Sequence, residues 1–567
     1  MKYYSTVFLL LLASLNWAAG KLTLSEIMYH PVEGGTFLED DYEYLEFTNT
    51  GDATLALSGY YVDMGIIYVF PNYSLGINET VVVVKNALAF AERYPDVDYL
   101  GVFSSGSLKN SGETIRVTKS GVTQLEVSYE DISPWPVLAD GTGFSLQLID
   151  VNASIINDAS AWTTSAEVNG NPGVIEVAQS VEQAVVINEV LTSPIFGDLD
   201  KIELYNSSDS TVDVSGWYIS DDVKSTSPFI IPDGTTIEPN SFLVFDEDDF
   251  NPDQLGFSWS RKGDVVALLA TKNGSLTGYE DYFKLDAMED GFSFGRHVNS
   301  IGDAFLVRQS SSSFLNKNDE PLIGPLVINK ILYAPDAYMD QFIELKNISN
   351  STIILVNEAL VDSNSYKISG VSFKFPVEVA IEVEAGQSVF LTAISPASFK
   401  SKYGLPLQSQ VFQFTGTLST NGEEIKIEVP LYRDVLTDGS YDNFYMTIDQ
   451  VNFSSLSPWP DAYENGAYIQ RVNNEIFGND PANWRLSDEP IVSFTSKIIE
   501  TNINVLTLSN DLLGIDGLED FSYHMYNVNG VLVQHGASSS TIDIGKLDQG
   551  LYFLKVNETT SYKIIKD

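Results

Sequence analysis

One short block of sequence occurs three times in this chain and limits what the chain can fold into. It begins with a hydrophobic residue, Glu, a second hydrophobic residue, one variable residue and Asn, and it occupies residues 45–62, 202–219 and 343–357. The hydrophobic residues alternate with others, which is the pattern of a strand with one apolar face. The Asn and the small polar residues after it favour a turn, because such side chains bond their own backbone. Each copy therefore predicts a strand, a turn and a second strand.

The spacing of the copies has the size of a domain. Glu46, Glu203 and Glu344 mark the same position in the three blocks and lie about 140 to 160 residues apart, which is too long for the repeat of a solenoid. Many other short strands are predicted between Gly, Asn, Asp and Pro turns. We therefore expect the all-β class: three tandem immunoglobulin-like β-sandwich domains and a small C-terminal β-sandwich. Short helices are expected at residues 87–95 and 395–404.

The chain divides into five predicted parts. Residues 1–20 join a lysine, a short apolar run and terminal small residues, which is typical of a secretory signal peptide. The three repeat domains then span residues 21–178, 185–320 and 326–489. The third diverges, because Lys330 stands where the first two copies have Glu26 and Glu189. Residues 490–567 form the last part, in which alternating strands surround Asn-Gly and Gln-Gly turns.

Composition excludes several kinds of partner and site. The chain has no cysteine, so disulfides and cysteine metal sites are excluded. A net charge of −46 repels phosphate backbones, so no nucleic acid partner is expected. After the first 20 residues no apolar stretch is long enough for a spanning helix, so no transmembrane segment is expected. With 44% hydrophobic residues, 567 residues can form several packed cores.

The sequence offers little catalytic chemistry. Its four histidines show no metal-ligand spacing, and two of them lie in the last domain. No Gly-x-Ser-x-Gly motif supports a serine nucleophile. The recurring Glu46, Glu203 and Glu344 are interpreted as strand or turn hydrogen-bonding groups rather than catalytic acids. We therefore predict that the protein is not an enzyme and has no catalytic, cofactor-binding or metal site residues.

Calcium is the one cofactor that the sequence leaves open. Residues 246–253 and 38–46 are the densest acidic runs, and Ca²⁺ accepts six to eight oxygen ligands from irregular loops. Neither run has the spacing of a specific calcium loop. Both are predicted to be solvated loops.

Two tryptophans occur in matching Ser-Pro-Trp-Pro segments, at Trp135 and Trp459. An exposed tryptophan at such a place would offer a flat platform for a sugar ring. Their recurrence beside hydrophobic strands favours a place in the sandwich core instead.

Several of these motifs together resemble a known family. They are Ser-Glu-Ile-Met or Ile-Asn-Glu-Val, then Ile-Glu-Leu-Tyr-Asn at 202–206, Ser-Gly-Tyr or Ser-Gly-Trp, Pro-Asp-Gly-Thr at 232–235 and Leu-x-Asn-x-Gly-Glu at 108–113. In this order they resemble the lamin-tail domain, an immunoglobulin-like β-sandwich. The resemblance extends from residue 21 to about residue 489 and implies the same fold for each copy.

The last part resembles a second family. Asn529-Gly530, Ile542-Asp543-Ile544, Leu547, Gly550-Leu551-Tyr552 and residues 563–566 follow in the order of the type IX secretion system C-terminal sorting domain. This resemblance implies a Gram-negative bacterium of the Bacteroidota kind. It also implies the type IX secretion machinery as a partner and a secreted or outer-membrane cell-surface destination.

We therefore expect a non-catalytic secreted or cell-surface protein that presents tandem modules for binding or adhesion, with an extracellular protein or glycan as its ligand. One alternative is a secreted hydrolase of polysaccharide or phosphoester, which a deep cleft holding two close carboxylates would favour. The other is a structural spacer or matrix protein, which uniformly polar surfaces would favour.

Overall fold

The structure is a computed structural model. It describes residues 19–175, 181–225, 227–336, 339–360, 364–462 and 467–487, and, near the C-terminus, 506–509, 512–515, 521–527, 531–538, 541–547, 550–557 and 560–566. The predicted signal peptide lies almost wholly outside these residues. The chain forms two compact units, residues 1–489 and 490–567. No helix within the described ranges combines the length and the apolar character that crossing a bilayer requires.

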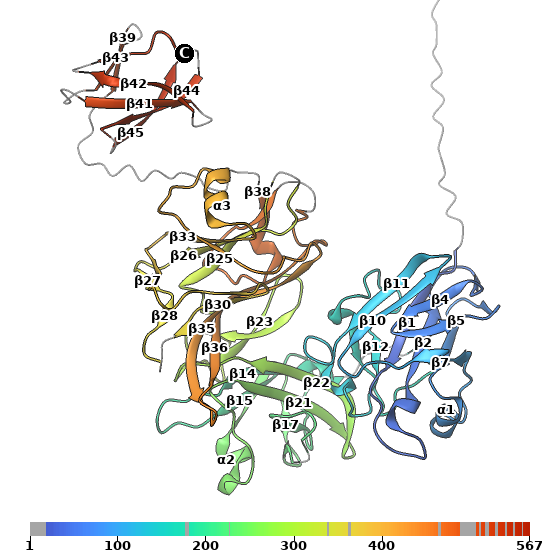
Figure 1. Cartoon of the computed structure of the whole chain (residues 1–567). Coiled ribbons are helices and arrows are strands. Elements are labelled where there is room, and N and C mark those ends of the chain that lie inside the picture. The colour runs from blue at the N-terminus through green and yellow to red at the C-terminus, as the bar shows by residue number, and fades with distance from the viewer. Residues whose placement is uncertain are drawn as a thin grey trace, which may run out of the picture. The chain divides into compact units, whose positions relative to one another are not determined.

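The first sandwich confirms the predicted all-β, immunoglobulin-like class (Figure 1). One sheet has the order β13-β12-β1-β2-β7-β8 and the other β11-β10-β4-β5-β9. The strands are β1 (Leu22–Met28), β2 (Tyr44–Asn49), β4 (Tyr60–Met64), β5 (Ile66–Val69), β7 (Thr80–Val84), β8 (Gly101–Val102), β9 (Ser105–Gly106), β10 (Glu113–Lys119), β11 (Val122–Tyr129), β12 (Leu146–Leu148) and β13 (Trp162–Thr164).

The second sandwich pairs a sheet of order β20-β15-β14-β23-β24 with one of order β18-β17-β21-β22. Its strands are β14 (Val185–Leu191), β15 (Lys201–Asn206), β17 (Tyr218–Ser220), β18 (Phe229–Ile230), β20 (Ser241–Asp246), β21 (Asp264–Lys272), β22 (Ser275–Leu285), β23 (Phe294–Val298) and β24 (Ala304–Arg308).

The third sandwich repeats the arrangement despite its divergent sequence. Its sheets have the orders β34-β33-β26-β25-β37-β38 and β31-β30-β35-β36. Its strands are β25 (Leu326–Leu332), β26 (Phe342–Asn347), β30 (Lys367–Ser369), β31 (Phe373–Lys374), β33 (Ser388–Thr392), β34 (Gln410–Gln413), β35 (Gly422–Val435), β36 (Tyr441–Ser454), β37 (Tyr468–Arg471) and β38 (Trp484–Ser487).

Four small ladders supplement these sheets, each a pair of two-residue strands. They are β3 (Leu55–Ala56) with β6 (Ser74–Leu75), β16 (Val212–Asp213) with β19 (Thr236–Ile237), β27 (Ile353–Ile354) with β32 (Glu382–Val383), and β28 (Val356–Asn357) with β29 (Asn364–Ser365).

The C-terminal unit has its own two sheets, of order β39-β40-β43 and β42-β41-β44-β45. Its strands are β39 (Leu506–Ser509), β40 (Leu512–Ile515), β41 (Phe521–Asn527), β42 (Leu532–Ser538), β43 (Thr541–Asp543), β44 (Gly550–Val556) and β45 (Thr560–Lys566). Met525, Ile544 and Leu554 are fully buried between them.

The α-helices are few and short: α1 (Ala87–Arg93), α2 (Glu247–Phe250) and α3 (Pro396–Tyr403), with 3-10 turns that include η1 (Glu39–Tyr42), η2 (Val137–Ala139), η4 (Val181–Ala184) and η5 (Pro252–Gln254). α1 and α3 confirm the two predicted helices. α2 corrects the loop predicted at residues 246–253. There Asp246 and Asp249 form a capping box that starts the helix, and Phe250 is buried at its end.

The sandwiches differ in how their cores are separated. The first encloses its own hydrophobic cluster, whereas the clusters of the second and third are continuous. The long hairpin of β35 and β36 makes this junction. Within it the Ala287 N–H donates to the Tyr445 carbonyl at 3.0 Å, and the Tyr432 hydroxyl donates to the Met288 carbonyl at 2.8 Å.

The repeated Asn explains why the block recurs. Asn49, Asn206 and Asn347 end the second strand of each sandwich, and all three are fully buried. The Asn206 amide donates to the carbonyls of Ser210 and Ile237 at 2.7 and 2.9 Å. It thereby holds the turn and a later segment together. Asn49 and Asn347 bond in the same way.

Replacement of this Asn should destabilise its sandwich. In Asn206→Ala several buried backbone carbonyls lose their donor, so the free energy of unfolding should fall by about 2 kcal/mol or more. Urea denaturation of the full chain, followed by tryptophan fluorescence, measures the change. Asn316→Ala, at an exposed position of the same sandwich, is the control and should change it by less than about 0.5 kcal/mol. Equal effects of the two variants would contradict the role of Asn206.

Candidate functional site

The recurring Glu lies in a buried cross-strand pair. Glu46 lies opposite Glu26, and Glu203 lies opposite Glu189. In the third sandwich Glu344 lies opposite Lys330. A register shift precedes the pair in all three, so the same bulge presents it each time. The structure thus places all three predicted Glu residues at one position of the fold.

The first pair consists of two buried carboxyl groups with raised pKa values. Glu26 and Glu46 are each 1% exposed. Burial raises the pKa of Glu26 to about 7; burial, together with the charge of Glu26, raises that of Glu46 to about 8. Glu26 Oε1 accepts bonds from the Tyr44 hydroxyl at 2.6 Å and the Ser145 hydroxyl at 2.5 Å, whereas its Oε2 finds no partner in the described part of the chain.

Both carboxyl groups accept hydrogen bonds from the segment that follows β13, the last strand of the first sandwich. The Asn171 N–H donates to Glu26 Oε1 at 3.3 Å, and the Gly173 N–H donates to Glu46 Oε2 at 2.6 Å. In the second sandwich Glu189 accepts the Ser313 N–H at 2.9 Å, in a segment at the same place in the domain. Glu26, Glu46 and Glu189 therefore accept hydrogen bonds from the segment that follows the last strand of their sandwich.

In the third sandwich an ion pair replaces the two buried carboxyl groups. Lys330 Nζ lies 3.0 Å from Glu344 Oε2, and both side chains are below one tenth exposed. A buried carboxylate is costly unless it is protonated, hydrogen-bonded or paired with a cation. Lys330 therefore supplies a different partner for the recurring Glu, at the position that Glu26 and Glu189 occupy in the other two sandwiches.

The raised pKa values predict that the first sandwich is less stable in base. A carboxyl whose folded pKa is raised stabilises the fold fully below its unfolded value near 4.5, and this stability is lost as the pH rises through about 7 and 8. Glu26→Gln keeps the oxygen that accepts all three bonds and removes one ionisable group. At about pH 9 it should raise the free energy of unfolding by about 1 to 2 kcal/mol.

Calorimetry of the full chain between about pH 5 and pH 9 measures this effect, because the first sandwich has its own core. Glu126→Gln, at an exposed site of the same sandwich, should leave the pH dependence unchanged. The prediction is wrong if Glu26→Gln has the same pH dependence as the wild type.

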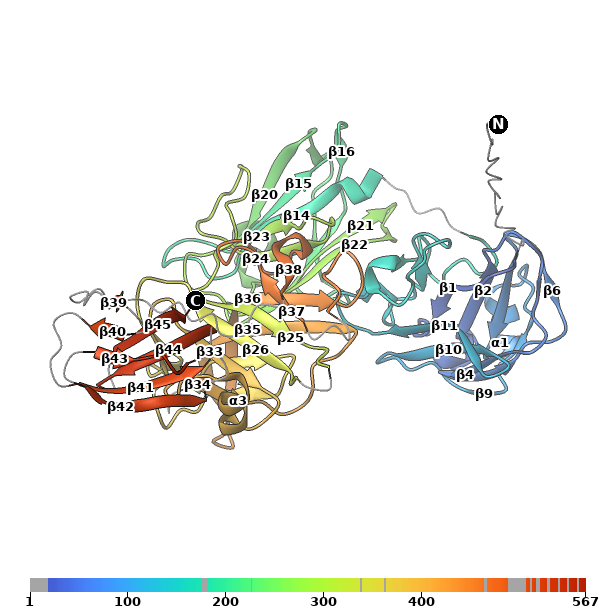
Figure 2. The same cartoon turned by 90° about the horizontal axis from the view of Figure 1, so that it is seen from above.

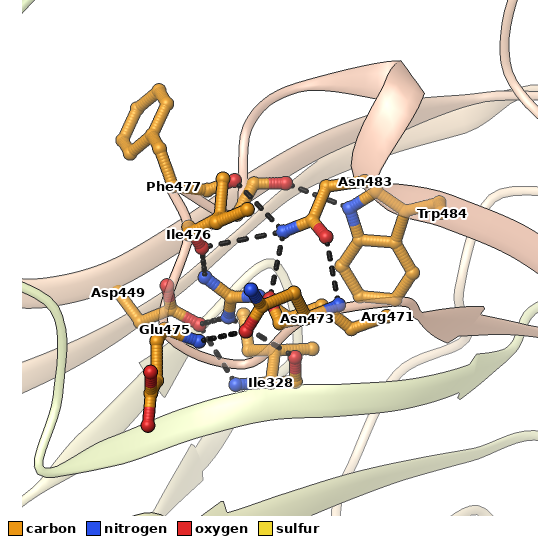
Figure 3. A network of polar contacts seen from close by, with 10 residues as sticks. Ile328, Asp449, Arg471, Asn473, Glu475, Ile476, Phe477, Asn483 and Trp484 are labelled. Atoms are coloured by element: carbon orange, nitrogen blue, oxygen red, sulfur yellow. Dashed lines mark hydrogen bonds and ion pairs between the residues drawn. The ribbon is translucent and has the colours of Figure 1, made fainter.

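A second buried polar pair lies in the third sandwich (Figure 3). The Arg471 guanidinium donates to Asp449 Oδ2 at 2.6 Å, and both side chains are almost fully buried. Asp449 Oδ2 also accepts the Ile328 N–H at 2.8 Å, and Arg471 donates to the Ile476 carbonyl at 2.5 Å. The pair thereby joins strands of both sheets to the loop after β37.

The other sandwiches treat this position in two ways. In the second, Arg296 pairs with Asp281, which accepts the Ile187 N–H at 2.7 Å. In the first, the strand registers place Leu148 and Leu125 there, and both are buried. An ion pair and two leucines therefore occupy the same site, which marks the pair as scaffold.

This equivalence predicts a rescue. Arg471→Leu alone leaves Asp449 as an unpaired buried charge and should lower the free energy of unfolding by about 3 to 5 kcal/mol. Adding Asp449→Leu reproduces the arrangement of the first sandwich and should restore all but about 1 to 2 kcal/mol. Chemical denaturation of both variants measures the difference. A double variant that is less stable than Arg471→Leu would contradict the interpretation.

The remaining candidates of the sequence are also engaged in the scaffold. His30 Nδ1 lies 2.5 Å from Asp140 Oδ1. The acidic run 38–46 is not the solvated loop that was predicted, because Glu43 is fully buried and accepts the Leu108 N–H at 2.8 Å. The described residues contain no group of three or more His, Asp or Glu side chains arranged to hold a metal ion.

Both tryptophans of the Ser-Pro-Trp-Pro segments are buried, as predicted. Trp135 packs against Trp162 with ring centroids 6.0 Å apart, and Trp459 packs against Trp484 at 6.3 Å. Their exposed fractions are 7% and 8%. They are core residues rather than exposed sugar platforms.

The first and second sandwiches enclose a cleft of about 770 Å³, which the sequence did not predict. The Ser133–Pro136 loop and β13 line it from the first sandwich, and β22 with Lys272 and Asn273 lines it from the second. Apolar side chains that include Leu138, Phe144 and Leu269 pack together beside it. The cleft has the size of a ligand site and a mainly polar wall.

Three carboxylates line this cleft: Glu167 is exposed, whereas Glu280 and Asp281 are bonded to other parts of the fold. Burial raises the pKa of Glu280 to about 8, and its two oxygens accept the N–H groups of Val137 and Leu138 at 2.7 and 2.8 Å. Asp281 is bonded to Arg296 and to Ile187. Glu280 and Asp281 join structural elements, so these two do not form a free catalytic pair of the kind that glycosidases use.

Two family models match the chain. The model described as Lamin Tail Domain matches residues 16–131 and 178–281, which are the first two copies of the block and their surroundings. The chain carries lamin tail domains. The model described as Secretion system C-terminal sorting domain matches residues 502–567. Both predicted resemblances are confirmed in these ranges. The third sandwich shares the strand order and the bulge of the two lamin tail domains.

The sorting domain identifies a secreted or cell-surface protein of the Bacteroidota type, handled by the type IX secretion machinery. Lamin tail domains and sorting domains are themselves non-catalytic families. The comparison with curated proteins gave no match.

Two solved structures show remote similarity. A DUF4876 family protein from Bacteroides thetaiotaomicron is 15% identical, with 38% of this chain and 85% of that chain covered and a TM-score of 0.19. PorZ, a surface component of the type IX secretion system of Porphyromonas gingivalis, is 10% identical, with 96% and 86% covered and a TM-score of 0.10. TM-scores this low do not establish a common fold.

Proposed function

We propose that this protein is a non-catalytic, secreted or cell-surface binding protein, and that the cleft between its first two lamin tail domains holds an extracellular protein or glycan ligand. The observation that carries the proposal is the cleft of about 770 Å³, which exposes polar side chains that include Lys272 and Gln183. Fixed polar groups around a concave surface suit a ligand rich in hydroxyl or amide groups.

The bonded state of the acidic groups supports binding rather than hydrolysis. Hydrolysis of a glycoside needs one protonated and one ionised carboxyl on either side of the scissile bond. Glu280 has a raised pKa, but both its oxygens already accept backbone N–H groups of η2. Asp281 is engaged with Arg296. Glu280 and Asp281 are therefore not a free acid pair, and the other carboxylate that lines the cleft, Glu167, is exposed.

Arrays of extracellular glycans and proteins test the proposal on the full mature chain, with and without Ca²⁺ and with hydrolysis assayed in parallel. We expect retention without turnover. The double variant Lys272→Ala/Gln183→Ala changes only exposed side chains of the cleft and should weaken retention about tenfold, the loss of roughly 1.4 kcal/mol of binding free energy.

The matched control is Lys317→Ala/Gln124→Ala, which removes the same two residue types at exposed positions outside the cleft. It should bind as the wild type does. Equal retention by both double variants would exclude the cleft as the site. Turnover that disappears in Glu280→Gln would show that the protein is a hydrolase.

A further inference from the structure

The second sandwich has an open sheet edge that its two sister sandwiches cover. β8 pairs in parallel with β7, and β34 pairs in parallel with β33. The equivalent strand of the second sandwich is β20, because Val244 lies opposite Glu203 as Val82 lies opposite Glu46. β20 is the last strand of its sheet, and no described strand pairs with its outer side (Figure 2).

A shorter connection accounts for the missing strand. The covering strand lies in the chain between the short helix and the next long strand. That connection comprises residues 94–112 in the first sandwich and 404–421 in the third, but only 251–263 in the second, where the 3-10 turn η5 takes up part of it. The shorter segment runs directly to Trp259, whose N–H donates to Asp200 at 3.0 Å. It has no length left for an extra strand.

The loss of the covering strand exposes β20. Val82 in β7 is 1% exposed and Phe390 in β33 is 6% exposed. Every residue of β20 except Phe245 is partly exposed. The Phe242 ring packs against the Tyr205 ring, with the ring centroids 4.8 Å apart, so apolar surface lies beside the edge.

The backbone of β20 has the hydrogen-bonding groups that its sister strands use. In the first sandwich the Leu100 N–H donates to the Val82 carbonyl at 2.7 Å. In β20 the Asp246 N–H turns away from β15 and donates to Asp249 at 3.1 Å. Because bonds alternate along an antiparallel pair, Val244 also points its N–H and carbonyl outward. An exposed row of this kind is a template for another strand.

We propose that the outer edge of β20 binds an extended segment of another polypeptide as a parallel strand, in the position that β8 and β34 occupy in the sister sandwiches. In a parallel pair the C-terminal end of the bound segment lies beside the C-terminal end of β20. Residues 246–249 there are all acidic. The partner segment therefore carries alternating apolar residues followed by Lys or Arg. This site is separate from the cleft, so either proposal can fail alone.

The probe is a labelled synthetic peptide that copies residues 408–415 (Gln-Ser-Gln-Val-Phe-Gln-Phe-Thr), which contain β34, with two added C-terminal lysines. Fluorescence polarisation with the full mature chain should show saturable binding that weakens as salt is added. Asp248→Lys, at an exposed position of the acidic end, should weaken it several-fold.

Methylated peptides provide the decisive control. In the third sandwich the Phe414 N–H donates to the Thr392 carbonyl at 3.1 Å, so the N–H groups of residues 412 and 414 face the sheet. N-methylation of the peptide at these two residues should reduce binding at least tenfold. N-methylation at the positions of residues 411 and 413 faces away and should preserve it. These peptides change no residue of the protein.

Val244→Pro gives an independent protein variant, since it removes an outward N–H and leaves the bonds to β15. It should abolish peptide binding while circular dichroism stays that of the wild type. Equal binding of the two methylated peptides would overturn the proposal, as would unchanged binding by a folded Val244→Pro variant. Self-association of the chain that Val244→Pro removes, without peptide binding, would overturn it in favour of pairing between two copies.

Discussion

The buried asparagine at the end of the second strand is the interaction on which each sandwich depends. The chain leaves one sheet there and turns toward the other, so several backbone carbonyls lose their ladder partners inside the core. A buried carbonyl without a donor costs free energy. The amide of Asn206 supplies donors to carbonyls of two separate segments, and its oxygen accepts the Ser208 N–H at 3.0 Å. No apolar side chain could satisfy these groups, which explains why the block is repeated with its Asn.

The three copies keep this Asn but differ in the residue pairs that they bury at equivalent positions. Two carboxyl groups in the first sandwich correspond to Lys330 and Glu344 in the third. Two leucines in the first correspond to Asp449 and Arg471 in the third. In each case the side chains stay buried and no charge is left without compensation. The raised pKa values of Glu26 and Glu46 favour their neutral forms, the third sandwich pairs opposite charges, and two leucines carry no charge at all. The sequence divergence of the third copy is therefore compatible with the same fold.

The two features that carry the proposed binding sites lie at the margins of the sandwiches. Between the first and second sandwiches, Glu280 binds the start of η2 beside a polar cleft. At the outer side of the second, the short connection at residues 251–263 leaves β20 without a covering strand. The cores are thus alike, whereas the cleft and the edge occur where a core ends and backbone or polar side chains meet solvent. Ligand binding is expected at such places because their groups are not all used by the fold.

The sequence by itself determined the class of fold, the repeated strand and turn at residues 202–219, the helices near residues 87 and 395, the burial of Trp135 and the sorting domain. These depend on short-range periodicity and on turn chemistry, which neighbouring residues report. Only the tertiary structure decided that Asp246 starts a helix, that Asp449 meets Arg471, that the Ser133–Pro136 loop and β22 form a cleft, and that β20 is left open. The ion pair, the cleft and the open edge depend on which distant segments of the chain meet. The helix at Asp246 depends on which of two local conformations the rest of the fold favours. Their free energy comes from burial and hydrogen bonds that exist only after the sheets have packed.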